Sequence, residues 1–176
     1  MAAKVVKPEP KLRRRILSLL RRHKIPYHAK QKEMWYDGKA IAAGLHNELD
    51  ILHEAGHWIA AKHRKVVNYG LGPDPDNETP KEIESPELVE DTQGAEEIAS
   101  ALGILLTEKV KGDTKAHLDY HNWQSEKTTK CRKDLLTAKK IAEKAGIRIP
   151  SALVDRVCGF HSELWDKRMQ KGLGNY

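Results

Sequence analysis

The chain has 176 residues, of which 31 are basic and 25 acidic, and its formal net charge at pH 7 is +6. This length suits one domain spanning residues 1–176, which can bury about two-thirds of its unfolded surface around a single core. Charged residues make up 32% of the chain, and no apolar run approaches the roughly 20 residues that a membrane helix needs. The N-terminus lacks the apolar segment and cleavage site of a secretory signal, so we expect a cytoplasmic protein without a membrane span.

A basic amphipathic helix is predicted near the N-terminus, at about residues 10–24. In KLRRRILSLLRRHK, apolar residues recur at i, i+4, i+7 and i+8; these are Leu12, Ile16, Leu19 and Leu20. They form one stripe with arginines opposite, and packing of such a stripe against the core is its commonest use. The positive surface would attract an acidic protein or an RNA backbone. Because no nucleic-acid motif with interleaved aromatic residues accompanies the charge, solvated helix faces are the simpler interpretation.

A short β-structure and a second helix are predicted next. Asp37 and Gly38 lie between two short β-prone runs in EMWYDGKAIAA, which is typical of a tight hairpin turn. Asn47 can cap the following helix. Acidic residues occupy the first turn of that helix, and its apolar residues continue to about Lys65. We expect the hairpin to be the only sheet.

The second half of the chain is predicted to be helical after one long loop. Residues 69–86 contain four prolines and two glycines, which disfavour regular structure over most of that stretch. Ser85 and Pro86 then have the character of a helix N-cap and first turn. Two further helices are expected, at about 128–145 and 151–169. The sequence therefore predicts a mainly α fold, formally α+β through one small β-hairpin.

The strongest functional signal is HEAGH, residues 53–57, in the middle of the second predicted helix. Residues four apart lie on one face of a helix, about 6 Å from each other, so His53 and His57 can place imidazole nitrogens on one ion. Glu54 is rotated by about 100° from His53 and can reach the open side of that ion. The alanine and glycine between them are small enough for another element to approach closely. The pattern predicts a metal site on a central helix, as in a zincin-like helical domain.

A third ligand has to come from another segment, because two histidines alone would bind a metal weakly. The acidic stretch ELVEDTQGAEEIAS offers Glu90, Glu96 and Glu97. On a continuous helix Glu90 and Glu97 share a face, since they are seven residues apart, whereas Glu96 is rotated away. The spacing leaves all three possible.

Several other polar residues are weaker candidates. Asp50 and His46 precede His53 by three and seven residues and could orient its ring. His117 and His121 form another i, i+4 pair, without a glutamate between them, and are expected at the surface or in the cleft. The two cysteines lack the CxxC spacing of a zinc knuckle or redox pair and are expected to be buried free thiols.

The stretch HEAGHWIAAKHRKVVNYGLGPDPDNE, which begins at His53, resembles the bacterial elongation factor P hydroxylase family. The shared features are a tryptophan after the second histidine, an Ala-Lys-x-Arg step, a hydrophobic pair, a glycine and a Pro-Asp loop. The VE at residues 89–90, with an alanine after it, and GIRIPSALVDRVCGFHSELW near the C-terminus are also similar to that family. The resemblance extends in patches over much of the chain.

This resemblance implies that the ligands are His53, His57 and Glu90 and that the metal is non-haem iron, Fe(II). It also implies hydroxylation of a lysine-derived side chain on a protein substrate, elongation factor P or a similar acidic protein. In such a site two histidines and one carboxylate occupy one face of the ion, Glu54 accepts a hydrogen bond or carries a proton, and Trp58 helps to roof the cleft. No signature of a flavin, nicotinamide or 2-oxoglutarate site identifies the reductant.

A second resemblance, in EEIASALGILL, is to the helix after HExxH in the ImmA/IrrE-type metallopeptidases. It implies Zn(II), with Glu96 as the third ligand and Glu54 as the general base that takes a proton from the metal-bound water. His117, His121 or His161 could then stabilise the oxyanion. The remaining alternative is a protein without catalysis, which holds a structural metal or none and whose basic faces dock a partner.

Overall fold

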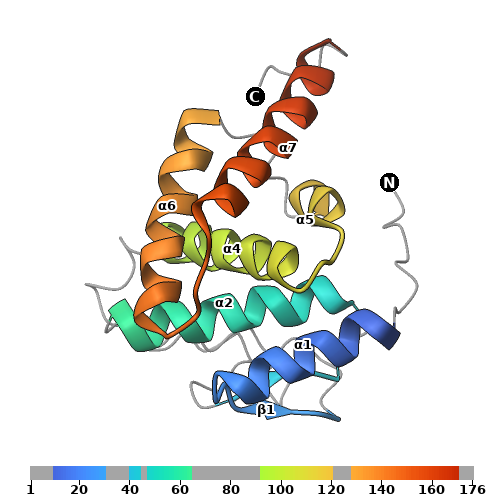
Figure 1. The fold of residues 1–176 in the computed structure, drawn as a ribbon, viewed down its shortest axis with the longest axis vertical. Coiled ribbons are helices and arrows are strands. Elements are labelled where there is room, and N and C mark those ends of the chain that lie inside the picture. Colours follow the sequence, from blue (N-terminus) through green and yellow to red (C-terminus); the bar gives the residue numbers. More distant parts are fainter. Residues whose placement is uncertain (1–9, 31–39, 45–46, 65–91, 121–127, 171–176) are drawn as a thin grey trace, which may run out of the picture.

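The computed structural model describes residues 10–30, 40–44, 47–64, 92–120 and 128–170. The elements are α1 (Pro10–Arg22), β1 (Tyr27–His28), β2 (Ile41–Ala42), α2 (Glu48–Arg64), α4 (Thr92–Lys109), α5 (Thr114–Tyr120), α6 (Thr128–Lys144) and α7 (Ser151–Gln170). In Figure 1, α2 and α4 run side by side through the middle, and α1 lies along α2. On the other side, α5, α6 and α7 pack against α4. The prediction of a mainly α fold is confirmed for the described residues.

Helix α1 is the amphipathic helix that the sequence predicts. All four residues of the predicted apolar stripe are buried, each exposed by 6% or less. The helix ends in a turn in which the Ile25 amide donates to the Leu20 carbonyl at 2.9 Å and Lys24 has a φ of 54°. This bond spans the left-handed residue, as in a Schellman cap, and it satisfies a terminal carbonyl of the helix.

The sheet consists of two very short strands that pair in parallel. Tyr27 lies opposite Ile41, and the ladder includes a 3.0 Å hydrogen bond from the Ile41 amide to the Pro26 carbonyl. The turn that we predicted at Asp37 and Gly38 lies outside the described residues. Within them the sheet is a parallel pair, not a hairpin.

Helices α2 and α4 are antiparallel and in very close contact. The Asn47 side chain caps α2 as predicted, because its Oδ1 accepts the Leu49 amide at 3.0 Å. A Cβ atom at Gly56 of α2 would lie 2.2 Å from the Ala99 carbonyl oxygen of α4, and one at Gly103 of α4 would lie 3.0 Å from the His53 Cα. The two glycines therefore let the backbones of the helices meet at the HEAGH segment.

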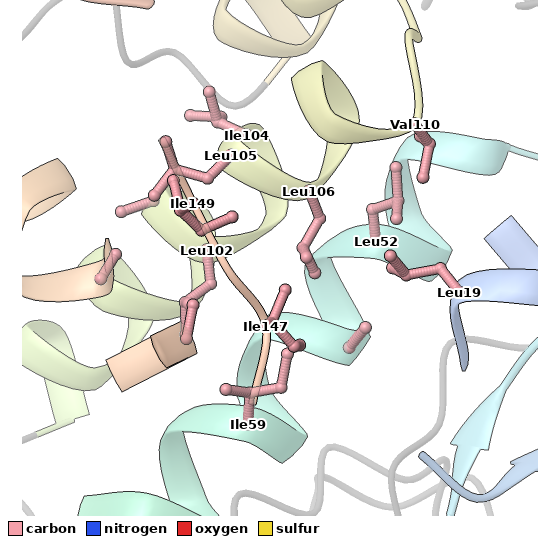
Figure 2. Packing of buried hydrophobic residues seen from close by; sticks show 14 of the residues in the cluster. Leu19, Leu52, Ile59, Leu102, Ile104, Leu105, Leu106, Val110, Ile147 and Ile149 are labelled. Atoms are coloured by element: carbon pink, nitrogen blue, oxygen red, sulfur yellow. The ribbon is translucent and has the colours of Figure 1, made fainter. Parts of the chain in front are cut away.

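The apolar core lies around this helix pair. Figure 2 shows Ile59 of α2 and Leu102 of α4 beside Ile147, which follows α6. These three side chains are 0% exposed. The core thus packs along the length of α2 and fixes the helix on which the two histidines stand.

The C-terminal helices agree closely with the prediction, whereas α5 was not predicted. Gly146, with a φ of 74°, ends α6 as expected from the sequence, and α7 has the predicted range to within one residue. Helix α5 begins after Asp113, whose Oδ1 accepts the Ala116 amide at 2.9 Å. An aspartate N-cap was therefore the sequence signal for α5. In the described ranges no helix combines the length and apolarity that a membrane crossing needs.

Candidate metal centre

The two histidines of HEAGH meet in the interior, as their spacing predicts. His53 and His57 are exposed by only 4% and 7%, and their Nε2 atoms lie 3.0 Å apart. The rings meet edge to face, with centroids 4.6 Å apart. Two nitrogens that each bind one ion at about 2.1 Å lie roughly 3 to 3.5 Å from each other. The pair therefore fits two ligand positions of a single metal ion.

A serine of α4 contacts the outer nitrogen of His53. Ser100 is 5% exposed, and its Oγ lies 3.4 Å from the His53 Nδ1. When the proton of His53 is on Nδ1, it donates to this hydroxyl and Nε2 keeps its lone pair directed toward His57. Partners of this kind fix the orientation and tautomer of metal-binding histidines. The sequence analysis missed Ser100, which lies 47 residues from His53 in the chain.

Helix α2 also buries carboxylates. Glu54, next to His53, is 6% exposed, and Asp50 is 8% exposed. Glu48, at the start of the helix, is 3% exposed and pairs with Arg13 of α1 at 2.9 Å. Burial of a carboxylate is unfavourable unless a partner compensates it. Glu54 is thus buried beside the histidine pair, next to His53 in the chain.

The third ligand stays a prediction. Among the side chains that the structure describes, no group of three or more His, Cys, Asp or Glu residues could hold a metal ion. Glu90 and His46 lie outside the described residues, and for Glu96 only the backbone position in α4 is described. Glu97 accepts a 2.6 Å ion pair from Lys130 of α6. Glu97 is thus engaged with a neighbouring helix and not with the histidine pair.

Position 96 shares a face of α4 with Ser100. Ser100 contacts His53, and the two helices are antiparallel. Glu96 is one turn before Ser100 in α4, and His57 is one turn after His53 in α2. Position 96 is therefore on the side of α4 that faces α2, whereas position 97 is rotated by about 100° from it. This side could be identified only from the contact between Ser100 and His53.

A third histidine lies directly behind the pair. His117 of α5 is 0% exposed, so the expectation of a surface position is wrong for this residue. Its Nδ1 lies 2.6 Å from the Thr107 Oγ1, and that hydroxyl donates to the Gly103 carbonyl at 2.9 Å. Thr107 therefore accepts the Nδ1 proton of His117. A Cβ at Gly103 would lie within 3.2 Å of both the His117 ring and the His53 backbone, so the two histidines pack on the same glycine.

The other candidates have contacts elsewhere or lie outside the described residues. His121 lies outside the described residues. His161 of α7 is 0% exposed and stacks on Trp165, with ring centroids 6.4 Å apart. Cys131 and Cys158 are free and buried, as predicted. Burial also raises the pKa of the Cys158 thiol, which makes it a poor nucleophile near neutral pH.

Comparisons of the chain with family models, curated proteins and solved structures find no match. Both family resemblances therefore stay hypotheses.

Proposed function

We propose that this chain is a metal-dependent enzyme whose ion is held by His53, His57 and one carboxylate from the segment 90–97. The observation that carries the proposal is the 3.0 Å separation of two buried Nε2 atoms on one helix. Both imidazoles are buried, and their Nε2 atoms converge to within hydrogen-bonding distance of each other. A bound metal ion is the partner that suits two converging imidazoles.

The first form of the proposal is an iron-dependent hydroxylase that acts on a lysine-derived side chain of a protein substrate, such as elongation factor P or a similar acidic protein. The resemblance that starts at His53 supports it, with Glu90 as the third ligand. An iron ion bound by two histidines and a carboxylate would supply the oxidising chemistry. The chain would contribute Ser100 to orient His53, and Glu54 to accept or hold a proton near the ion.

The second form is a zinc metallopeptidase, and the register of α4 favours it. Position 96 is on the same face of α4 as Ser100, which contacts His53, so a carboxylate at this position is a candidate third ligand, and Glu54 is buried next to His53. A zinc ion bound there would lower the pKa of a bound water to about 7. Glu54 would take the proton of that water, which is the role of the glutamate in HExxH peptidases.

The experiment that separates the two forms is metal analysis of protein purified without air, combined with assays of oxygen uptake and casein cleavage. Iron with oxygen uptake supports the hydroxylase, and zinc with cleavage supports the peptidase. In either case Glu54→Gln should lower turnover by roughly 100-fold or more, as for loss of a general base, and should leave the metal content unchanged. A protein that binds metal but shows neither activity, with elongation factor P tested as substrate, would refute the proposal of an enzyme.

Substitution of the three glutamates identifies the third ligand. Loss of metal with Glu90→Ala alone supports the hydroxylase alignment, and loss with Glu96→Ala alone supports the peptidase. Glu97→Ala is the matched control, because Glu97 already pairs with Lys130. If only Glu97→Ala loses metal, the assignment of helix faces given above is wrong.

A further inference from the structure

Much of the positive charge of this protein lies in one segment. Residues 10–30 contain eight of the 31 basic residues and none of the 25 acidic residues. The rest of the chain therefore has 23 basic and 25 acidic residues and is close to neutral. The segment comprises α1, the turn after it and β1, and it has no role in the metal centre.

The fold adds basic residues from two distant parts of the chain to this surface. Arg15 of α1 donates from Nη1 to the Lys111 carbonyl at 3.3 Å, and the Lys109 Nζ donates to the Arg148 carbonyl at 2.8 Å. The pKa of His23 is lowered, first by burial and then by the positive charges of Lys109 and Arg22. The end of α4 and the segment after α6 therefore extend the basic surface of α1.

An open groove of about 550 Å³ lies on this surface. The described residues that line it are Lys11, Arg14, Arg15 and Ser18, at i, i+3, i+4 and i+7 of α1. All four side chains can donate hydrogen bonds, and the guanidinium fork of arginine matches a phosphate group. Three of these four side chains are cationic, and residues 10–30 contain no acidic residue. The surface is therefore complementary in charge to a polyanion such as a phosphate backbone.

We propose that the basic groove, defined by Lys11, Arg14, Arg15 and Ser18, binds the phosphate backbone of nucleic acid without base specificity. Contacts to phosphates give affinity that depends on charge and carry no sequence information. This inference does not depend on the proposed metal chemistry, because α1 supplies no residue to the metal centre.

The test measures the binding of the full chain to fluorescein-labelled nucleic acids by anisotropy. The probes are a random-sequence DNA duplex and a single-stranded RNA, each 20 nucleotides long, in 50 and 200 mM salt. If three cationic side chains contact phosphates, affinity for the duplex should fall roughly 40-fold between these salt concentrations. Polyglutamate is the competitor that represents an acidic protein.

The variant Lys11→Glu/Arg14→Glu should weaken binding to both probes about tenfold or more, because it reverses two charges in the groove. It should fold normally, since both side chains are exposed and a glutamate in the first turn of a helix is favourable. The control is Lys133→Glu/Lys140→Glu, which makes the same charge change on exposed positions of α6. It should change affinity less than about threefold.

Three outcomes would overturn the proposal. One is the absence of binding at 50 mM salt, which would make the groove an ordinary solvated surface. Another is an equal loss of affinity in both double variants, which would mean that net charge alone attracts the probe. The third is competition by polyglutamate at a concentration of charge equal to that of the nucleic acid, which would assign the groove to an acidic protein.

Discussion

Helices α1 and α2 are adjacent in the fold but differ in the kind of side chain that each buries. Helix α1 buries four apolar residues and turns its charges outward, so its burial is favourable throughout. Among the described side chains of α2, the buried ones include five ionisable residues in addition to the apolar ones: Glu48, Asp50, His53, Glu54 and His57. Side chains of this kind are rarely buried without a partner.

This difference indicates which side chains of each helix are candidates for function. The buried residues of α1 are all apolar, as expected for an amphipathic helix. Its exposed charged side chains are available to bind a partner. Five ionisable side chains are buried among those described in α2, and two of them converge on one point, which is the arrangement on which the proposed metal site rests. The following predictions test this contrast, from the largest expected effect to the smallest.

Close contact between α2 and α4 is the structural condition for the site. Because a Cβ at Gly56 would overlap the Ala99 carbonyl oxygen at 2.2 Å, Gly56→Ala should destabilise the protein by about 3 kcal/mol in urea unfolding. Gly159→Ala is the control, since nothing lies within 4 Å of the Cβ position on α7. This control should stabilise the protein by about 0.5 to 1 kcal/mol. A neutral Gly56→Ala would contradict the close packing of the two helices.

The ion pair between α1 and α2 should also contribute to stability. Arg13→Met would leave the carboxylate of Glu48, which is 3% exposed, without its arginine. Arg13 is itself partly exposed, so the expected loss is about 2 kcal/mol, below the range for fully buried pairs. Arg132→Met, which removes the exposed pair with Asp155, should have little effect. Equal effects of the two substitutions in chemical denaturation would show that burial of Glu48 is unimportant.

The hydrogen bond behind the histidine pair should have a smaller effect. Thr107→Val keeps the shape of the side chain but removes the acceptor of the His117 Nδ1 proton. We expect a loss of about 1 kcal/mol in thermal unfolding, typical of one buried hydrogen bond. Thr137→Val, at a position where the hydroxyl donates to the Lys133 carbonyl near solvent, serves as the comparison. If the two variants lose the same stability in thermal unfolding, the hydrogen bond between His117 and Thr107 does not contribute to stability.

The smallest effect concerns His23 on the basic surface. Its pKa in the folded protein is below the usual value of 6.5, so the unfolded chain binds a proton more readily as the pH falls through 6.5. Its contribution to stability is present above pH 6.5 and is lost as the pH falls toward the folded pKa. His23→Gln should therefore reduce the loss of stability between neutral and mildly acidic pH. An unchanged pH profile of the melting temperature would rule out this contribution.

The sequence predicted the features that depend on local periodicity. The stripe of α1 and the range of α7 follow from apolar spacing, and the cap at Asn47 and the end of α6 at Gly146 follow from well-known terminal preferences. Helix α5 was missed because it has only seven residues and little apolar content. The parallel pairing of β1 with β2 could not be foreseen, since each strand has two residues.

The candidate site was predicted only in part, for a physical reason. His53 and His57 share one helix, so their spacing was sufficient to bring them together. The contacts of Ser100 and His117 depend on how α4 and α5 pack on α2, and no local pattern encodes that packing. The third ligand depends on a segment outside the described residues or on a side chain that is not described, so Glu90 and Glu96 both stay predictions.

The central claim is that the two histidines of α2 hold a metal ion, and direct measurement of metal binding tests it. Apo-protein prepared with a chelator would be titrated with Fe(II) without air, and separately with Zn(II), by calorimetry. We predict one ion per chain for the wild type and for His28→Ala, which changes an exposed histidine outside the site. His53→Ala and His57→Ala should each abolish stoichiometric binding. Unchanged binding in either variant, or no binding to the wild type, would contradict the account.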